Sequence, residues 1–248
     1  MLELQNVSFT VPEENNGRKE IVKNVSMTVD DGKLVVITGP NGGGKSTLAK
    51  LIMGIERPTE GHILFNGEDI TALSVTERAK KGISFAFQQP VKFKGLKVID
   101  LLRIASGKKL AVGDACQYLS AVGLCARDYI DRELNASLSG GELKRIEIAQ
   151  ILSRSTKLSI FDEPEAGIDL WSFNNLIKVF EGMRANIREG SVIIISHQER
   201  ILNVADEIVV ISNGRVDRCG RKEEILPTLL GSATISNFCT GTVNKEDV

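Results

Sequence analysis

The sequence predicts an α/β protein with a mixed, mostly parallel sheet and a phosphate-binding loop. Three observations lead to this fold class. Apolar, β-branched runs at 34–38, 158–161 and 191–196 have the composition of buried strands. Each run is followed directly by polar or glycine residues, and apolar residues recur at helical spacing in later segments. With 248 residues, 42% of them hydrophobic, the chain is long enough for one large domain or one domain with an inserted lobe.

Composition and charge exclude several classes of protein. The 31 basic and 32 acidic residues leave a net charge of -1, so no bulk charge draws the chain toward nucleic acid. The first residues lack the basic start and long apolar stretch of a signal peptide. The longest apolar runs have strand length, far short of the ~20 residues of a membrane helix. We therefore expect a cytoplasmic protein, peripheral to any membrane, with no nucleic-acid partner.

The cysteines do not predict a disulfide framework or a zinc site. They lack a CxxC pair, and neither histidine is near them in the sequence. We expect ordinary thiols at Cys116, Cys125, Cys219 and Cys239.

The stretch 34–54 is typical of a strand, a glycine-rich loop and a helix. The aliphatic run 34–38 precedes the glycines, and apolar residues at helical spacing follow until Gly54, which suits a C-terminal cap. The loop fits the pattern G-x-x-x-x-G-K-[ST]. The predicted nucleotide-binding residues are Gly39, Pro40, Asn41, Gly42, Gly43, Gly44, Lys45, Ser46 and Thr47.

Each residue type in this loop has a physical use. Glycines let the chain aim successive backbone N–H groups at phosphate oxygens, and the positive end of the following helix adds to that field. Lys45 is placed to reach the β- and γ-phosphates, and the Ser46 hydroxyl to ligate Mg²⁺, with Thr47 the weaker candidate. A flexible turn with an accidental lysine would not explain the strand and helix on either side.

Two adjacent carboxylates end the strand at 158–161. Asp162 and Glu163 are followed by Pro164, which prevents further strand pairing. Open α/β sheets bind ligands at the carboxyl ends of their strands. We expect Asp162 to hold Mg²⁺ or its water, and Glu163 to act as general base on the attacking water. Taken alone, the stretch would be interpreted as a solvated acidic turn.

A third pattern, "LSGGE", precedes a helix with one apolar face. Ser139 is a good N-cap, and the amides of Gly140 and Gly141 offer a second anion-binding helix terminus, followed by Glu142. The spacing alone is also compatible with an ordinary capped helix that binds no anion.

His197 follows the strand at 191–196. A single histidine at a strand end is usually structural or solvated, but beside a phosphate site it becomes a candidate sensor of the γ-phosphate. His62 has no such context and is expected at the surface.

These four patterns, in this order, resemble those of the ATP-binding cassette ATPases over nearly the whole chain. By that resemblance "GPNGGGKST" is the Walker A loop, "LSIFDE" the Walker B strand, "LSGGE" the signature and "EAGID" the D-loop with Asp169. His197 corresponds to the switch histidine. Gln88 corresponds to the Q-loop glutamine, which senses Mg²⁺ and the attacking water and couples them to a partner.

The resemblance implies an enzyme that hydrolyses ATP with Mg²⁺. Its fold would be a P-loop NTPase: a RecA-like core with an N-terminal antiparallel β element over residues 1–87 and 151–248, and a helical subdomain over 88–150. The helix-like composition of 97–130 agrees. The active form would be an ATP-dependent homodimer in which two subunits lie head to tail, so the signature of one completes the site of the other in trans.

Two positions depart from the family pattern. Family members usually stack the adenine on an aromatic residue where this chain has Val11, and Phe9 has the same strand parity. The selectivity for ATP over GTP is therefore left open. The signature ends in Glu142 where transporters most often carry Gln, a change that the family tolerates.

The sequence disfavours one output of the ATPase and leaves three others. About 90 residues separate Walker A from the signature, too few for the coiled coils of DNA-repair and chromosome-organising relatives. The segment 82–103 and "ISHQERIL" are similar to the Suf iron-sulphur cluster assembly ATPase, which implies SufB- and SufD-like scaffold partners. Pro164 is instead typical of transporter ATPases, whose partners are transmembrane permease subunits. The Suf-type function is the preferred prediction, the transporter the alternative, and a catalytically inactive binding module is disfavoured.

Overall fold

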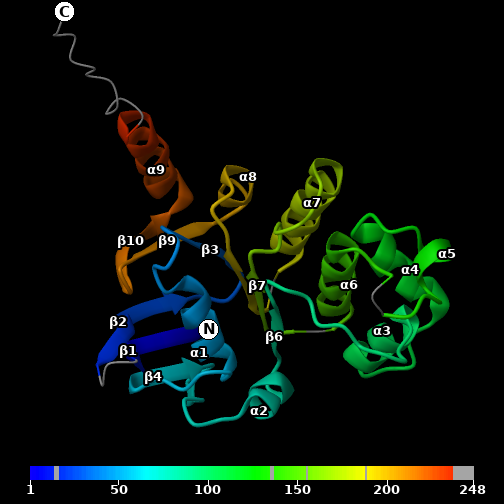
Figure 1. Cartoon of the computed structure of the whole chain (residues 1–248), viewed down its shortest axis with the longest axis horizontal. Helices are drawn as coiled ribbons and strands as arrows, with labels where there is room; N and C mark the ends of the chain where they lie inside the picture. Colours follow the sequence, from blue (N-terminus) through cyan, green and yellow to red (C-terminus); the bar gives the residue numbers. More distant parts are fainter. Residues whose placement is uncertain (14–16, 135–136, 155, 188, 237–248) are drawn as a thin grey trace, which may run out of the picture.

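The computed structural model describes residues 1–13, 17–134, 137–154, 156–187 and 189–236; Cys239 and the polar C-terminal tail lie outside these ranges. The described residues form two sheets and a group of helices set to one side of them (Figure 1).

The first sheet is antiparallel and lies at the N-terminal end of the chain. Its strand order is β2-β1-β4-β5, and β1 pairs with both β2 and β4. The strands are β1 (Leu2–Pro12), β2 (Arg18–Val29), β4 (Glu60–Phe65) and β5 (Glu68–Asp69). The antiparallel element that the resemblance implied is therefore confirmed.

The second sheet is mostly parallel, with strand order β10-β9-β3-β8-β7-β6. Only the β9–β10 pair is antiparallel within it. Its strands are β3 (Leu34–Thr38), β6 (Ile83–Ala86), β7 (Leu158–Asp162), β8 (Ser191–Ile195), β9 (Glu207–Ser212) and β10 (Arg215–Arg221). The three strands predicted from apolar runs are β3, β7 and β8.

Both faces of this parallel sheet are buried, which explains its unbroken apolar runs. Side chains of a strand alternate between faces. In β3, Val35 and Ile37 belong to a core shared with the antiparallel sheet, whereas Leu34 and Val36 belong to a second core. That second core includes residues of the helices on the other side.

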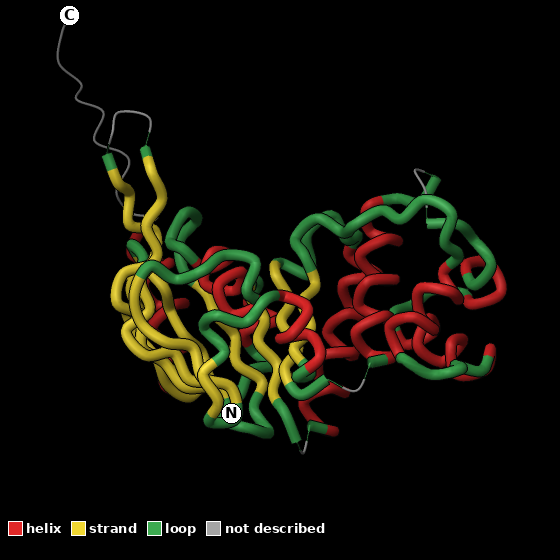
Figure 2. The backbone as a smooth tube through the Cα atoms, turned by 90° about the horizontal axis from the view of Figure 1, so that it is seen from below, coloured by secondary structure: helices red, strands yellow, loops and turns green. Residues whose placement is uncertain are grey.

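The helical lobe stands beside the sheets, and helices α3 and α4 pack on α6 (Figures 1 and 2). Its helices are α3 (Val98–Ser106), α4 (Val112–Ala121), α5 (Ala126–Tyr129) and α6 (Gly140–Ser153). The helical character predicted for 97–130 is confirmed, while the exact limits of the lobe stay a prediction.

The remaining helices connect or cover the strands. They are α1 (Lys45–Met53), α2 (Val75–Lys80), α7 (Leu170–Asn186), α8 (Glu199–Leu202) and α9 (Lys222–Ser236). None of the helices in the described part of the chain has both the length and the apolar character to span a bilayer.

Candidate functional site

Four strands of the parallel sheet deliver the predicted site residues to one edge. Ala86 of β6 pairs with Phe161 of β7, and Asp162 at the end of β7 pairs with Ile195 of β8. Ile37 of β3 also pairs with Ile195. Because parallel strands end at the same edge, the segments that follow them meet there. The glycine loop, Gln88, the two carboxylates and His197 are all carried by these segments.

The loop after β3 has a shape that other residues cannot adopt. Gly39 has φ 132°, and a Cβ there would lie 2.0 Å from the carbonyl oxygen of Ile211. Gly44, with φ 101°, is the N-cap of α1 and makes no side-chain capping bond. The first turn of α1 therefore presents its amides without a competing side chain, as a phosphate site requires.

Lys45 lies inside this loop and is 6% exposed. Its Nζ donates hydrogen bonds to the carbonyl oxygens of Gly39 (2.7 Å) and Pro40 (2.9 Å). Burial lowers the pKa of its ammonium group, and the charges of Glu163 and Asp162 oppose that shift. The cation is thus held among the loop carbonyls, beside the two carboxylates.

A hydrogen bond joins Ser46 and Asp162, both of which were expected to hold Mg²⁺. The Ser46 Oγ donates to Asp162 Oδ1 at 3.0 Å, although the residues are 116 positions apart. Asp162 is 3% exposed, and burial raises the pKa of its carboxyl group. A hydroxyl and a carboxylate are oxygen ligands of the kind that Mg²⁺ takes, so this pair fits the ion.

Glu163 has an unusual backbone conformation. Its φ of 44° lies in the left-handed region, which costs a non-glycine residue of order 1–2 kcal/mol. Its amide donates to the carbonyl oxygen of Ile195 at 3.0 Å. Its Oε2 accepts a 2.6 Å hydrogen bond from Gln88 Nε2. The structure therefore joins Glu163, expected to be the general base, to Gln88, which the resemblance placed at the attacking water.

Lys144 was not predicted from the sequence. It lies in the signature helix α6, is fully buried, and donates from Nζ to the carbonyl oxygens of Phe87, Gln88 and Asp162. Burial lowers the pKa of its ammonium group. One cation thus joins the start of α6 to the ends of β6 and β7.

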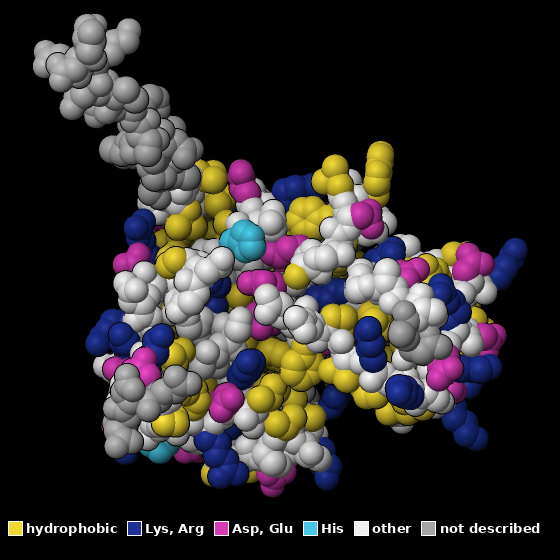
Figure 3. Space-filling view, viewed as in Figure 1, with side chains coloured by type: hydrophobic (Ala, Val, Ile, Leu, Met, Phe, Trp, Pro, Cys, Tyr) yellow, Lys and Arg dark blue, Asp and Glu magenta, His cyan; other side chains and the backbone are white. Residues whose placement is uncertain are grey.

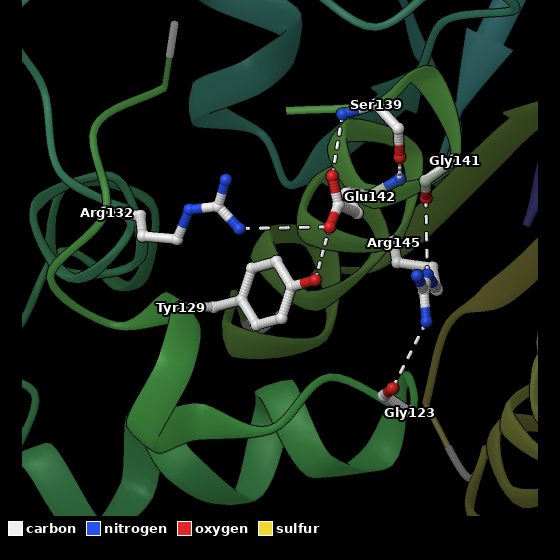
Figure 4. Close-up of polar contacts among 7 residues, drawn as sticks. All are labelled: Gly123, Tyr129, Arg132, Ser139, Gly141, Glu142 and Arg145. Carbon is white, nitrogen blue, oxygen red and sulfur yellow. Dashed lines mark hydrogen bonds and ion pairs between the residues drawn. The ribbon is translucent and has the colours of Figure 1, made fainter. Parts of the chain in front are cut away.

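The N-terminus of α6 is closed by its own side chains (Figure 4). Ser139 is the N-cap, as predicted, and forms a capping box with Glu142: Ser139 Oγ accepts from the Glu142 amide (3.2 Å), and Glu142 Oε2 accepts from the Ser139 amide (2.6 Å). The Tyr129 hydroxyl donates to Glu142 Oε1, and Arg132 lies 3.8 Å from the same oxygen. The Tyr129 bond is the main cause that lowers the pKa of Glu142.

The signature glycine Gly141 has close neighbours on two sides. Arg145 donates from Nε to the carbonyl oxygen of Gly141 (3.3 Å) and from Nη1 to that of Gly123 (3.1 Å), as Figure 4 shows. A Cβ at Gly141 would lie 3.0 Å from the carbonyl oxygen of Gly167, in the predicted D-loop. Gly140 at the tip is exposed.

Four other residues considered in the sequence analysis have simple settings. His197 is exposed and lies after β8. Asp169 is the N-cap of α7, and its Oδ1 accepts from the Ser172 amide at 2.9 Å. His62 is exposed as expected, with Nδ1 2.9 Å from Asp69 Oδ2. Phe9 is partly buried against the core of the antiparallel sheet, so its stacking on adenine stays a prediction.

Comparison with known proteins gives concordant matches. The family model described as "ABC transporter" matches residues 22–166. An uncharacterized ABC transporter ATP-binding protein of Methanocaldococcus jannaschii is 39% identical over 217 residues, which cover 84% of this chain and 86% of the relative. The sulfate/thiosulfate import ATP-binding protein CysA of Synechocystis is 33% identical, over 82% of this chain and 57% of that relative.

Among solved structures, the dimeric post-hydrolysis state of an ATP-binding cassette bound to ADP and Pi superposes with a TM-score of 0.79 at 23% identity. The match covers 90% of this chain and 99% of that one. This likeness confirms the expected fold of a nucleotide-binding core, an N-terminal antiparallel sheet and a helical subdomain.

Proposed function

This chain belongs to the ABC transporter family and is an ATPase, and we propose that it is the nucleotide-binding subunit of a membrane transporter whose pore is a separate polypeptide. The names of the relatives support this assignment, since one is a sulfate/thiosulfate import protein. They favour the transporter alternative over the iron-sulphur assembly function that was preferred from the sequence.

In this proposal the open end of α1 binds the phosphates of ATP. The single observation that carries it is the joined set of uncapped α1 amides, buried Lys45 and the Ser46–Asp162 pair at one sheet edge. Lys45 exchanges its loop carbonyls for β- and γ-phosphate oxygens. Ser46, Asp162 and Gln88 would hold Mg²⁺, which when bound neutralises phosphate charge.

Glu163 is proposed as the general base for the attacking water. Its carboxylate is already oriented by Gln88 Nε2 at 2.6 Å, and its backbone by the bond to Ile195. A proton taken from the water would pass to this carboxylate as the water oxygen attacks the γ-phosphorus, while the bond from that phosphorus to the β–γ bridging oxygen breaks and ADP leaves with the bonding electrons. His197, exposed at the same edge, is proposed to contact the γ-phosphate.

The second half of the site is proposed to come from another copy of the chain. A relative of the same fold is described as dimeric with ADP and Pi, which supports this arrangement. Ser139, Gly140 and Gly141 would then approach the γ-phosphate in trans, with Asp169 near the subunit contact. The head-to-tail homodimer would form with ATP and separate after hydrolysis.

A partner would bind beside Gln88 in this proposal. Phe87, Val91 and Phe93 are 37%, 49% and 38% exposed and line a cavity of about 180 Å³ between β6 and the helical lobe. Exposed aromatic side chains beside a catalytic residue support a protein contact that senses nucleotide.

A Suf-type ATPase acting on SufB- and SufD-like scaffolds remains the second candidate. One observation favours it: in the segment "ISHQERIL", which is similar to the Suf ATPase, α8 begins two residues after His197, carries Arg200 and buries Ile201 and Leu202.

One experiment distinguishes the two functions. The chain is affinity-purified from its native cell after membranes and cytosol have been separated, and the bound proteins are identified by mass spectrometry. We expect recovery from membranes with a polytopic permease. Recovery from the cytosol with scaffold proteins, and without a permease, would instead establish the Suf-type function.

A further inference from the structure

We propose that Glu165 is a positioning residue that acts through Ser196 to fix the segment carrying His197. Glu165 lies in the loop after β7, two residues beyond Glu163, and Ser196 lies between β8 and His197. The proposal rests on the role proposed above for His197 at the γ-phosphate.

The surroundings of Glu165 are unusual for a carboxylate. Its Oε1 accepts a 2.5 Å hydrogen bond from Ser196 Oγ. Its Oε2 is inaccessible to solvent and has no hydrogen-bond partner within the described ranges. Burial raises the pKa of this carboxyl group, while the Ser196 bond and the charge of His197 oppose that shift. A carboxylate oxygen that is buried without a partner costs free energy, so its position calls for a functional reason.

Ser196 transmits this contact to the histidine segment. It is fully buried, and its Oγ accepts a 3.0 Å hydrogen bond from the amide of Gln198 while donating to Glu165. Its own amide donates to the carbonyl oxygen of Ile37 in β3. The Ser196 hydroxyl therefore holds the residues on both sides of His197, and its proton points at Glu165.

The same two loops are also joined through the backbone. The Glu163 amide donates to the carbonyl oxygen of Ile195 at 3.0 Å, one residue before Ser196. The loop of the proposed general base and the loop of His197 are thus linked at two successive points, Glu163–Ile195 and Glu165–Ser196. Acidic side chains gather near the middle of this face of the molecule (Figure 3). The geometry holds the two catalytic groups in one fixed relation.

The first test uses steady-state ATPase rates of single variants. Ser196→Ala and Glu165→Ala should each lower kcat about tenfold, the usual effect of losing a hydrogen bond to a charged group, with KM for ATP within about twofold of wild type. Glu165→Gln keeps an acceptor for the Ser196 proton and should recover most of the rate. Ser191→Ala is the matched control, since Ser191 is a buried serine at the start of β8, the strand that precedes Ser196, and its hydroxyl has no partner within the described ranges.

The second test asks whether the effect passes through His197. Ser196→Ala should add little further loss to His197→Ala, because both changes remove the same contribution. Independent losses that multiply would overturn the proposal. So would wild-type kcat in both Ser196→Ala and Glu165→Ala.

A third measurement separates this proposal from the proposed function. The chain has two histidines, so the nucleotide-free protein gives two imidazole Cε1–H signals, one from each ring, and His62 serves as an internal reference. Ser196→Ala and Glu165→Ala should shift and sharpen the His197 signal and leave that of His62 unchanged. If His197→Ala hydrolyses ATP at the wild-type rate, the role of His197 is wrong, yet the signals still test the positioning. An unmoved His197 signal in both variants contradicts it.

Discussion

The two helix N-termini proposed to face phosphate, those of α1 and α6, are built differently. At α1 the N-cap is Gly44, no side chain caps the helix, and Lys45 lies among the loop carbonyls. At α6 the N-cap is Ser139, and a carboxylate of the same helix already accepts from the Ser139 amide. Tyr129 and Arg132 hold that carboxylate in place.

Because of this difference we expect the two termini to have separate roles: α1 binds the nucleotide, and α6 completes the nucleotide site of a second subunit. The α1 terminus leaves its positive field unopposed and adds a cation, so it should bind nucleotide in an isolated subunit. At α6 the capping box already binds part of the terminal amides, so this terminus is stable without a ligand. Alone, it should add little to the affinity for nucleotide. From this contrast we expect nucleotide affinity to reside in the α1 loop and α6 to contribute only when a second subunit presents it.

The largest expected effect comes from Glu163→Gln, which leaves both termini intact. Removing the proposed general base should lower kcat about 10²–10⁴-fold while ATP stays bound. The α1 terminus of one subunit and the α6 terminus of the other would then stay bound to the same ATP. The variant should therefore elute as an ATP-dependent dimer in size-exclusion chromatography. The double variant with Lys45→Ala is the control and should elute as a monomer. A wild-type hydrolysis rate in Glu163→Gln would remove this residue from catalysis.

Lys45→Ala acts on the α1 terminus alone. Losing charge-assisted hydrogen bonds to phosphate should weaken ATP binding about 10–100-fold, measured by calorimetry on the monomer. Lys50→Ala is the matched control, since Lys50 is an exposed lysine in the last turn of the same helix. Equal affinities of the two variants would show that α1 does not bind nucleotide in the proposed way.

Tyr129→Phe acts on the α6 terminus alone. It removes the phenol hydrogen bond to Glu142 and should lower the free energy of unfolding by about 1 kcal/mol in urea titrations. ATP binding to the monomer should stay at the wild-type value. Tyr118→Phe is the control, because Tyr118 is the other tyrosine of the chain and also packs in the helical lobe. A loss of monomer affinity in Tyr129→Phe would contradict the separation of the two termini.

The smallest expected effect is a pH dependence at α6. The pKa of Glu142 is lowered, chiefly by the Tyr129 bond, so its carboxylate contributes stability above the unfolded value of about 4.3. That contribution is lost as pH falls through the lower folded pKa. Thermal melting should therefore show wild type more stable than Glu142→Gln at pH 7, with the gap closing below about pH 4. A gap that does not narrow as pH falls below the unfolded value would assign it to packing.

Local patterns predicted the parts of the site that lie close together in the sequence. The glycine loop, the Asp162–Glu163 pair and the Ser139 cap each depend on neighbours within a few residues, and all three occur where predicted. Lys144, Tyr129 and Glu165 escaped prediction. A lysine in an amphipathic helix or a glutamate in a loop is ordinarily exposed, so neither pattern indicates burial.

The amino-acid sequence by itself determined the strands, the turns and the residue types that suit phosphate, because backbone preferences and apolar periodicity act over short distances. The tertiary structure alone decided which groups meet. Ser46 reaches Asp162 and Gln88 reaches Glu163 because parallel strands end at one sheet edge. Lys144 and Glu165 acquire their contacts because that edge is covered by α6 and by the segment after β8. Contacts across such sequence separations follow from packing of whole elements, which no local pattern encodes.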